Sequence, residues 1–352
     1  MRRALCVSTA VIAVVLVQAP SRAQDLVLER FRDSLDALRT QAGIPALSAT
    51  IVGTNDIVWE AAFGKQDVER SIAARPGTPF HLDGLTQTFT ATLILGCVET
   101  SRLGLDERIS QRVPDAPEPN ATIRQLLSHT SDGTFKYRLD RLNPLAGVVP
   151  MCARDSFRTA LARLFDQLAM IDSVPGPDVV QLSPDEVFTG PALERYGRVL
   201  GGLAIPYAVD SRGQPSPSRY SASTLQASGG IVSTTRDLAQ FARGLMTGHG
   251  VAPDITALMW TPAVGANGQP LPHGLGWFVQ SYNGETVVWQ FGVSDNASSS
   301  LMLTVPGRGL TLVLLANSDG LSRPYPLAAG DVTVSPFARL FLGSFVRVSA
   351  AR

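Results

Sequence analysis

"FHLDGLTQTFTATLIL", residues 80–95, is the stretch that decides the fold. Its apolar opening leads into a short polar turn, and the apolar residues after the turn recur at helical spacing. A helix that starts from a tight turn presents free backbone N–H groups and the positive end of its dipole. Such a start is typical of a catalytic helix. The turn "GLTQ" (84–87), however, contains neither a strong nucleophile nor a base.

The segments before this stretch predict a helix and a hairpin. Apolar residues recur at near-helical spacing from residue 26, and Gly43 ends the pattern. Residues 47–67 then indicate two strands joined at "GTND". After the stretch, residues 105–205 are mostly helical, and the Pro-, Ser- and Gly-rich segment 205–222 predicts an exposed loop.

Within the helical region, residues 154–171 form a clear amphipathic pattern. A shorter helix follows "NATIRQLL", where Asn120 or Thr122 is the expected N-cap. Ser233 or Thr234 is the expected N-cap of a further helix in "STTRDLAQFARGLMTG", which begins at residue 233.

The C-terminal third predicts an antiparallel sheet. Four runs alternate there like strands: 274–283, 286–293, 298–307 and 310–318. Short turns such as "YNGE" and "PGRG" join them, which favours antiparallel pairing. A final helix near 335–348 would cover one face of this sheet.

The order of elements predicts an α/β fold of the α+β type. We expect one domain over residues 24–352, with a sheet lobe at about 25–80 and 223–352 and an all-helical lobe at about 81–222. An alternating βαβ series is not predicted, and the chain contains no GxGxxG sequence. A nucleotide-binding fold is therefore disfavoured.

The first 23 residues predict a secretory signal peptide. A basic start, a short apolar run and small residues near Ala23 match that pattern, and the run is too short for a spanning helix. We expect an exported protein, periplasmic or extracellular, with no membrane span after cleavage. Removal of Arg2, Arg3 and Arg22 leaves 27 basic against 30 acidic residues, a formal charge of −3. Such a balance does not favour nucleic acid as a partner.

Cys97 and Cys152 remain after cleavage. We expect two buried thiols, since free cysteine behaves as a small hydrophobe, with one disulfide as the alternative for an exported protein. The four histidines are scattered, and His249 and His273 stand in Gly-rich segments where we expect solvent exposure. No metal site or cofactor is therefore expected.

Several blocks together resemble the serine β-lactamase and penicillin-binding-protein superfamily, in particular the branch of class C β-lactamases and DD-peptidases. They are "FHLDGLTQTFTATLIL", "GLDERISQRVPDAPEPNATIRQLLSHTSDG", "ASGGIVSTTRDLAQFARGLM", "GLGWFV", "VVWQFGVSDNASS" and "LTLVLLANS", in that order. The resemblance covers about residues 26–345 and implies a two-lobed fold with the site between the lobes. In this family the histidine matching His129 is usually a structural residue at a turn.

The resemblance also places the family's catalytic positions, and most hold other residues. Gly84 stands where the nucleophilic Ser of Ser-x-x-Lys is expected, and Gln87 stands where its Lys is expected. Gln290 replaces the Lys or His of the edge strand, two residues before Gly292. A glycine has no atom to attack with, and an amide cannot act as a base at neutral pH.

The Tyr-x-Asn motif of the family matches in part. Tyr137 corresponds to its tyrosine, while Leu139 replaces its asparagine. A displaced Ser-x-x-Lys is excluded by the lysine count. Only Lys65 and Lys136 occur, and the residues three positions before them are Ala62 and Gly133.

These losses predict a catalytically inactive, exported relative that binds a peptide, a cell-wall fragment or a protein partner. Gly84, Gln87, Tyr137, Gln290 and Gly292 are the candidate ligand-binding residues. Two alternatives stay open. One is an esterase or amidase with another nucleophile, for which Thr86, Thr88 and Ser131 are the hydroxyls near the site. The other is a structural relic without a ligand.

Overall fold

The computed structural model describes residues 22–182, 188 and 190–346. Its largest element is a seven-stranded sheet of order β3-β2-β1-β12-β11-β10-β9, in which all neighbouring pairs are antiparallel. The strands are β1 (Ala46–Val52), β2 (Ile57–Asp67), β3 (Ile72–Ala73), β9 (Phe278–Tyr282), β10 (Glu285–Ser294), β11 (Ser298–Val305) and β12 (Leu310–Ala316). The predicted hairpin around "GTND" and the antiparallel C-terminal sheet are confirmed.

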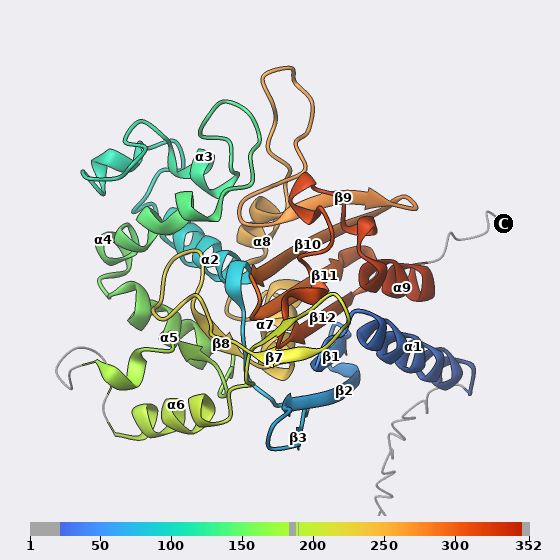
Figure 1. Cartoon of the computed structure of the whole chain (residues 1–352). Helices are drawn as coiled ribbons and strands as arrows, with labels where there is room; N and C mark the ends of the chain where they lie inside the picture. The colour runs from blue at the N-terminus through green and yellow to red at the C-terminus, as the bar shows by residue number, and fades with distance from the viewer. Residues whose placement is uncertain (1–21, 183–187, 189, 347–352) are drawn as a thin grey trace, which may run out of the picture.

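Helices cover both faces of this sheet (Figure 1). Helices α1 (Arg22–Gln41) and α9 (Pro336–Phe345) pack together on one face, and α7 (Thr235–Thr247) packs on the other. Strand β12 shows why both faces are apolar. Leu312 and Leu314 face the core under α1 and α9, whereas Val313 and Leu315 face the core under α7.

The helical lobe lies beside the sheet and is built around α2 (Thr86–Glu99) (Figure 1). Most α2 residues are buried, because α4, α5 and α8 pack against it. The remaining helices are α3 (Ile123–Leu127), α4 (Val149–Ala153), α5 (Phe157–Gln167), α6 (Pro191–Gly201) and α8 (Pro253–Met259). The predicted caps Thr122 and Thr234 accept backbone N–H groups at the starts of α3 and α7.

Two small sheets complete the fold. Strands β4 (Phe80–His81), β8 (Ile231–Ser233) and β5 (Val174–Pro175) form one of them, and β6 (Tyr207–Val209) and β7 (Pro215–Pro217) form the other. The prediction of an exposed loop at 205–222 is therefore wrong in part. The ring of Tyr207 is buried, and Tyr220 stacks on His81 with ring centroids 3.9 Å apart. These aromatic side chains hold the segment against the domain.

The preference for two free thiols was wrong. Cys97 on α2 and Cys152 on α4 form a disulfide, with their Cα atoms 5.6 Å apart. Both cysteines are buried, as expected. The sequence separation of 55 residues gave no sign of this pairing, because the packing of α4 on α2 brings the two side chains together.

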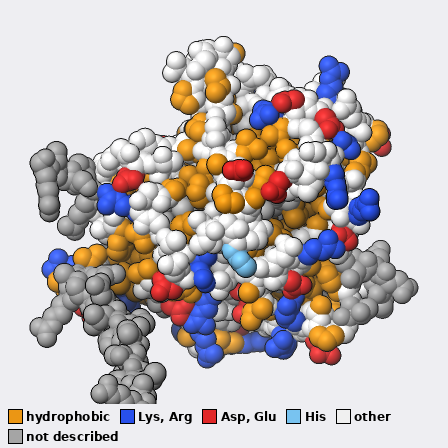
Figure 2. Space-filling model, turned by 180° about the vertical axis from the view of Figure 1, so that it is seen from behind, with side chains coloured by type: hydrophobic (Ala, Val, Ile, Leu, Met, Phe, Trp, Pro, Cys, Tyr) orange, Lys and Arg blue, Asp and Glu red, His pale blue; other side chains and the backbone are white. Residues whose placement is uncertain are grey.

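The predicted signal peptide covers residues 1–23, of which 1–21 lie outside the described residues. Among the described helices, none combines the length and apolar character needed to cross a bilayer. The face opposite to Figure 1 carries basic and acidic side chains interspersed with apolar ones (Figure 2).

Candidate functional site

The candidate site lies where the two lobes meet, at the turn before α2. Residues Asp83–Leu85 form a short 3-10 turn that packs against β10 and β11. The approach is so close that a Cβ atom on Gly292 of β10 would clash with Leu82 O and lie 2.8 Å from Gly84 N. Glycine at position 292 thus lets the strand and the turn come into backbone contact.

Leu139 occupies the space beside Gly84. A Cβ atom on Gly84 would lie 2.8 Å from Leu139 Cδ1 and 3.1 Å from Phe291 O. Both distances are shorter than ordinary van der Waals contact. A side chain at position 84 would therefore require Leu139 to shift and would lie close to a strand carbonyl.

Gln87 forms the first half of a hydrogen-bond chain that crosses the site. Its Nε2 donates to Tyr137 Oη at 2.7 Å and to Gly84 O at 3.1 Å. Its Oε1 lies 3.0 Å from His129 Nε2. Both donors and the acceptor of this buried amide are thereby satisfied.

Gln290 forms the second half of the chain. Its Oε1 accepts from Tyr137 Oη at 3.0 Å and from Phe291 N at 2.9 Å. Its Nε2 lies 3.3 Å from His273 Nε2 and 3.1 Å from Gly276 O. Tyr137 thus joins the amides of Gln87 and Gln290, the two positions where the sequence resemblance implies basic residues.

The backbone partners of the two imidazoles fix the direction of every bond in the chain. Arg138 N can only donate to His129 Nδ1 (3.2 Å), so His129 Nε2 carries the proton and donates to Gln87. Gly274 O can only accept from His273 Nδ1 (2.8 Å), so His273 Nε2 accepts from Gln290. We refer to this set, His129-Gln87-Tyr137-Gln290-His273, as the neutral chain.

Burial keeps the neutral chain uncharged. It lowers the pKa of His129 to about 3 and lowers the pKa of His273 well below its usual value. It also raises the pKa of the Tyr137 hydroxyl, which stays protonated. The expectation that His273 is solvated was wrong, because residues 271–278 fold back and bury its ring against Phe278, 4.7 Å between centroids. His249 is exposed, as expected.

Among the described residues, none of the alternative hydroxyls makes a hydrogen bond to a general base. Thr88 is buried and donates to Leu85 O at 2.8 Å, and Thr86 is fully buried. Ser131 accepts from Arg141 Nη1 at 2.9 Å, and a guanidinium cannot take up a proton. None of the three has the paired base that activates a hydroxyl nucleophile.

Sequence reasoning missed Asp83, which lies between the expected site and β11. The residue is buried in a left-handed conformation, with φ +49°, and accepts from Ser298 Oγ at 2.7 Å. Burial raises its pKa to about 7. An acid inside an apolar run was the available signal, and a carboxyl in that context is expected to be unusual.

The geometry thus brings together all six positions named from the sequence: Gly84, Gln87, Tyr137, Leu139, Gln290 and Gly292. Gly84, Gln87, Gln290 and Gly292 are buried, while Tyr137 and Leu139 are partly exposed. The site can offer amide and phenol hydrogen bonds.

Comparison with known proteins decides the family. The model of the family "Beta-lactamase" matches residues 31–169 and 175–332. The chain belongs to the beta-lactamase family. This beta-lactamase family chain is 32% identical over 94 residues to protein flp of Staphylococcus aureus, a match that covers 25% of the chain and 19% of flp. The chain thus spans about a fifth of that relative's length.

A second relative matches along nearly its whole length. Penicillin-binding protein 4 of Amycolatopsis lactamdurans is 24% identical over 348 residues, which cover 88% of the chain and 87% of that protein. The resemblance inferred from the sequence blocks is therefore confirmed.

Solved structures confirm the fold of this beta-lactamase family chain. The octameric penicillin-binding protein homologue from Pyrococcus abyssi superposes with a TM-score of 0.72 at 18% identity, over 90% of the chain and 77% of that protein. The class C beta-lactamase from Rhodobacter sphaeroides gives 0.66 at 16% identity, over 89% and 98%. The mixed α/β fold with an antiparallel sheet is thus the family's fold.

Proposed function

We propose that this protein is an exported, catalytically silent member of the beta-lactamase family that acts by binding a peptide, a cell-wall fragment or a protein partner. The observation that carries the proposal is the neutral chain. The two positions expected to hold basic groups hold amides. Both amides bond to Tyr137, and groups of the protein satisfy their remaining donors and acceptors.

The state of the nucleophile position supports the same conclusion. In a comparable hydrolase, loss of the nucleophile alone lowers turnover on the order of 10⁶-fold. Here Gly84 has no side chain, and Leu139 fills the adjacent space. Since the imidazoles of the neutral chain have lowered pKa values and committed hydrogen bonds, neither is free to act as a base.

Export is supported by two features of the chain. Residues 1–23 match the pattern of a signal peptide. The buried Cys97–Cys152 disulfide fits an oxidising compartment, since such bonds are rare in the cytosol. The periplasm and the extracellular medium are both oxidising, so the disulfide is compatible with either location.

A labelling and turnover assay tests the catalytic part of the proposal. The protein is incubated with a fluorescent penicillin, a chromogenic cephalosporin and a p-nitrophenyl ester. We expect no covalent label and no release above the buffer rate. Hydrolysis that disappears in Ser131→Ala or Thr88→Ala would overturn the proposal in favour of the hydrolase alternative.

Rebuilding the motif tests whether Leu139 blocks the site. Gly84→Ser with Gln87→Lys should remain unlabelled by the fluorescent penicillin, because the new Cβ lies 2.8 Å from Leu139 Cδ1. Adding Leu139→Ala should relieve this clash and permit labelling. Equal labelling of the double and triple variants, each checked for folding by circular dichroism, would show that Leu139 does not block the nucleophile position.

A further inference from the structure

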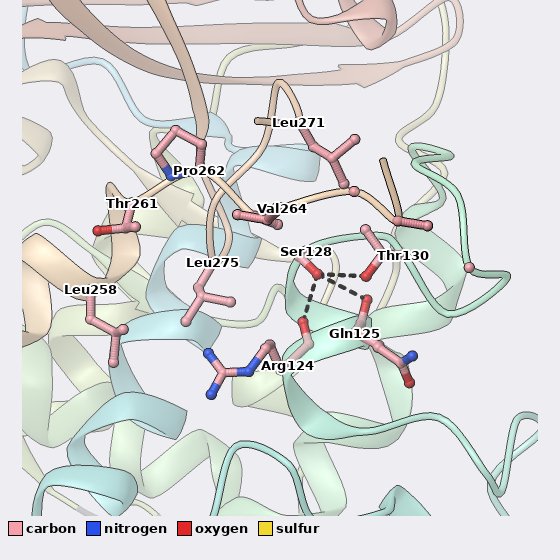
Figure 3. A pocket seen from close by; sticks show the side chains of 14 residues that line it. Arg124, Gln125, Ser128, Thr130, Leu258, Thr261, Pro262, Val264, Leu271 and Leu275 are labelled. Carbon is pink, nitrogen blue, oxygen red and sulfur yellow. Dashed lines mark hydrogen bonds between the residues drawn. The ribbon is translucent and has the colours of Figure 1, made fainter. Parts of the chain in front are cut away.

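A cavity lies next to the segments that carry the two histidines of the neutral chain. Its volume is about 460 Å³, within the range of small-ligand sites. One wall is α3 with the turn that follows it, Arg124–Gly133, and the other is the segment Leu258–Leu275, which includes the end of α8 and leads to β9 (Figure 3). We call it the α3 cavity.

The two walls of the α3 cavity differ in chemistry. The end of α8 and the segment that follows it contribute apolar groups, which are Leu258, Pro262, Val264, Leu271 and Leu275. The α3 wall contributes the hydroxyls of Ser128 and Thr130, with Arg124 and Gln125 beside them. A ligand that fits must therefore have one apolar and one polar side.

Hydrogen bonds within the α3 wall determine which polar groups it can offer. Buried Ser128 donates its proton to Arg124 O at 2.8 Å, so the 2.9 Å contact with Thr130 is donated by Thr130. This leaves Thr130 Oγ1 as an acceptor. Gln125 Oε1 accepts from a backbone N–H, while its Nε2 has no partner within the part of the chain that the structure covers. The wall thus offers Thr130 Oγ1 as an acceptor for an amide N–H group of a ligand.

The charge around the α3 cavity is balanced. Arg124 is the one charged residue that lines it, and its guanidinium is paired with Asp106 through bonds of 2.8 and 3.0 Å. Residues 261–276, which include most of the opposite wall, contain no Asp, Glu, Lys or Arg. A charged ligand would lose its hydration without gaining a partner of opposite sign, so an uncharged ligand is favoured.

The α3 cavity is also linked to the neutral chain. His129 lies between the wall residues Ser128 and Thr130, and His273 lies between Leu271 and Leu275. The two imidazole centroids are 4.8 Å apart. A ligand that separated the walls would therefore displace His129 and His273, the two ends of the neutral chain.

We propose that the α3 cavity binds an uncharged, amide-bearing ligand with one branched apolar group, its amide N–H donating to Thr130 Oγ1 and its apolar group against Leu258, Leu271 and Leu275. This inference rests on the proposed binding function and assigns it a location apart from Gly84. A neutral leucyl amide is the simplest compound with these features.

Titration with three small probes tests the specificity. Binding of N-acetyl-leucinamide to the protein is followed by ligand-observed NMR, beside N-acetyl-leucine, which is anionic, and leucinamide, which is cationic. We expect saturable binding of the neutral probe and affinities at least about tenfold lower for each charged probe. Equal affinities for the three probes, or no saturable binding of the neutral one, would overturn the inference.

Variants locate the binding. Thr130→Val keeps the side-chain shape, removes the acceptor and should weaken binding of N-acetyl-leucinamide roughly three- to tenfold. Thr247→Val is the matched control, because its hydroxyl donates to Arg243 O at the exposed end of α7. Ala263→Phe should fill the cavity and abolish binding. Val264→Arg tests the same wall of the cavity with little risk to folding, because the Val264 side chain is 69% exposed.

The outcomes separate this inference from the proposed function. Unchanged binding in Thr130→Val, Ala263→Phe and Val264→Arg would place the probe elsewhere and overturn the α3 cavity alone. Covalent labelling or turnover in the penicillin, cephalosporin and ester assay would overturn catalytic silence, whatever the leucinamide titration gives.

Discussion

At the scale of single residues, the neutral chain shows how buried polar side chains can be satisfied without any charged group. A lysine at position 87 or 290 would bring a buried ammonium with a large desolvation cost. A glutamine has two donors and acceptor lone pairs, and at both positions these are used. The result is a satisfied polar network, which stabilises the contact between the lobes.

Removing the central hydroxyl of the neutral chain should destabilise the fold. Tyr137→Phe leaves Gln87 and Gln290 each without one buried partner, at a cost of about 1–3 kcal/mol in the free energy of unfolding. Urea denaturation measures this loss. Tyr282→Phe is the control, because the Tyr282 hydroxyl makes no hydrogen bond within the described chain. Equal stability of Tyr137→Phe and wild type would mean that the chain contributes nothing.

Asp83 should give the fold a distinct pH dependence. Burial raises its pKa to about 7, whereas an unfolded aspartate ionises near 3.8. The folded state therefore binds more protons than the unfolded state between these pH values. This group's contribution to stability is fully present below about pH 4, falls as pH rises to about 7 and is constant above that.

Asp83→Asn removes this dependence. Asparagine cannot ionise, and its amide oxygen can still accept from Ser298. The stability of the variant relative to wild type should rise by about 4 kcal/mol between pH 4 and pH 7.5, measured by urea denaturation. Asp56→Asn, at an exposed turn, is the control. A pH-independent difference for Asp83→Asn would contradict the raised pKa.

At the scale of elements, α3 is a short helix that depends on its cap. Thr122 accepts from Gln125 N at 3.2 Å, and Gln125 Oε1 accepts from Thr122 N at 2.9 Å. This reciprocal pair is a capping box. Because the helix has five residues, its own backbone bonds contribute little, and the cap sets where it begins.

Thr122→Ala should lower the free energy of unfolding by about 1 kcal/mol, since an N-terminal donor loses its partner. Thr122→Ser keeps the hydroxyl and should remain close to wild type in the same urea titration. If both variants lose the same amount, the methyl group rather than the cap is responsible.

Local patterns predicted most elements, because their causes are local. The apolar spacing in α1, the cap Thr234 of α7 and the turns of the C-terminal sheet all depend on neighbours in sequence. The segment 205–222 was mistaken for a loop because its Pro, Ser and Gly content hides the anchoring contacts of Tyr207 and Tyr220. Those contacts are tertiary and leave no periodic signal.

At the scale of the whole molecule, the Cys97–Cys152 disulfide ties α2 to α4 across 55 residues. Closing a loop of this length is expected to contribute about 4 kcal/mol, chiefly by restricting the unfolded chain. Urea denaturation with and without dithiothreitol should show this loss. The double variant Cys97→Ala with Cys152→Ala should be insensitive to the reductant. Wild-type stability unchanged by complete reduction would contradict the prediction.

From the sequence, residues of the candidate site could be predicted only where the family-like sequence blocks include them. They named Gly84, Gln87 and Gln290, and the geometry places these residues together. They could not indicate that Tyr137 links the two amides, that His273 is buried beside them or that Leu139 lies close to position 84. Each of these facts depends on how distant segments pack, which a motif does not encode.

The order of strands also constrains how the chain can fold during its synthesis. Strand β1 is interior to the sheet, and its partner β12 is one of the last strands to be made. The bond from Ala46 N to Asn317 Oδ1 spans 271 residues. Until the ribosome has released residue 316, the β1–β2 hairpin has an unpaired edge and an uncovered apolar face, which is a hazard for aggregation. Folding of the sheet lobe should therefore be post-translational and slow, as for other chains of high contact order.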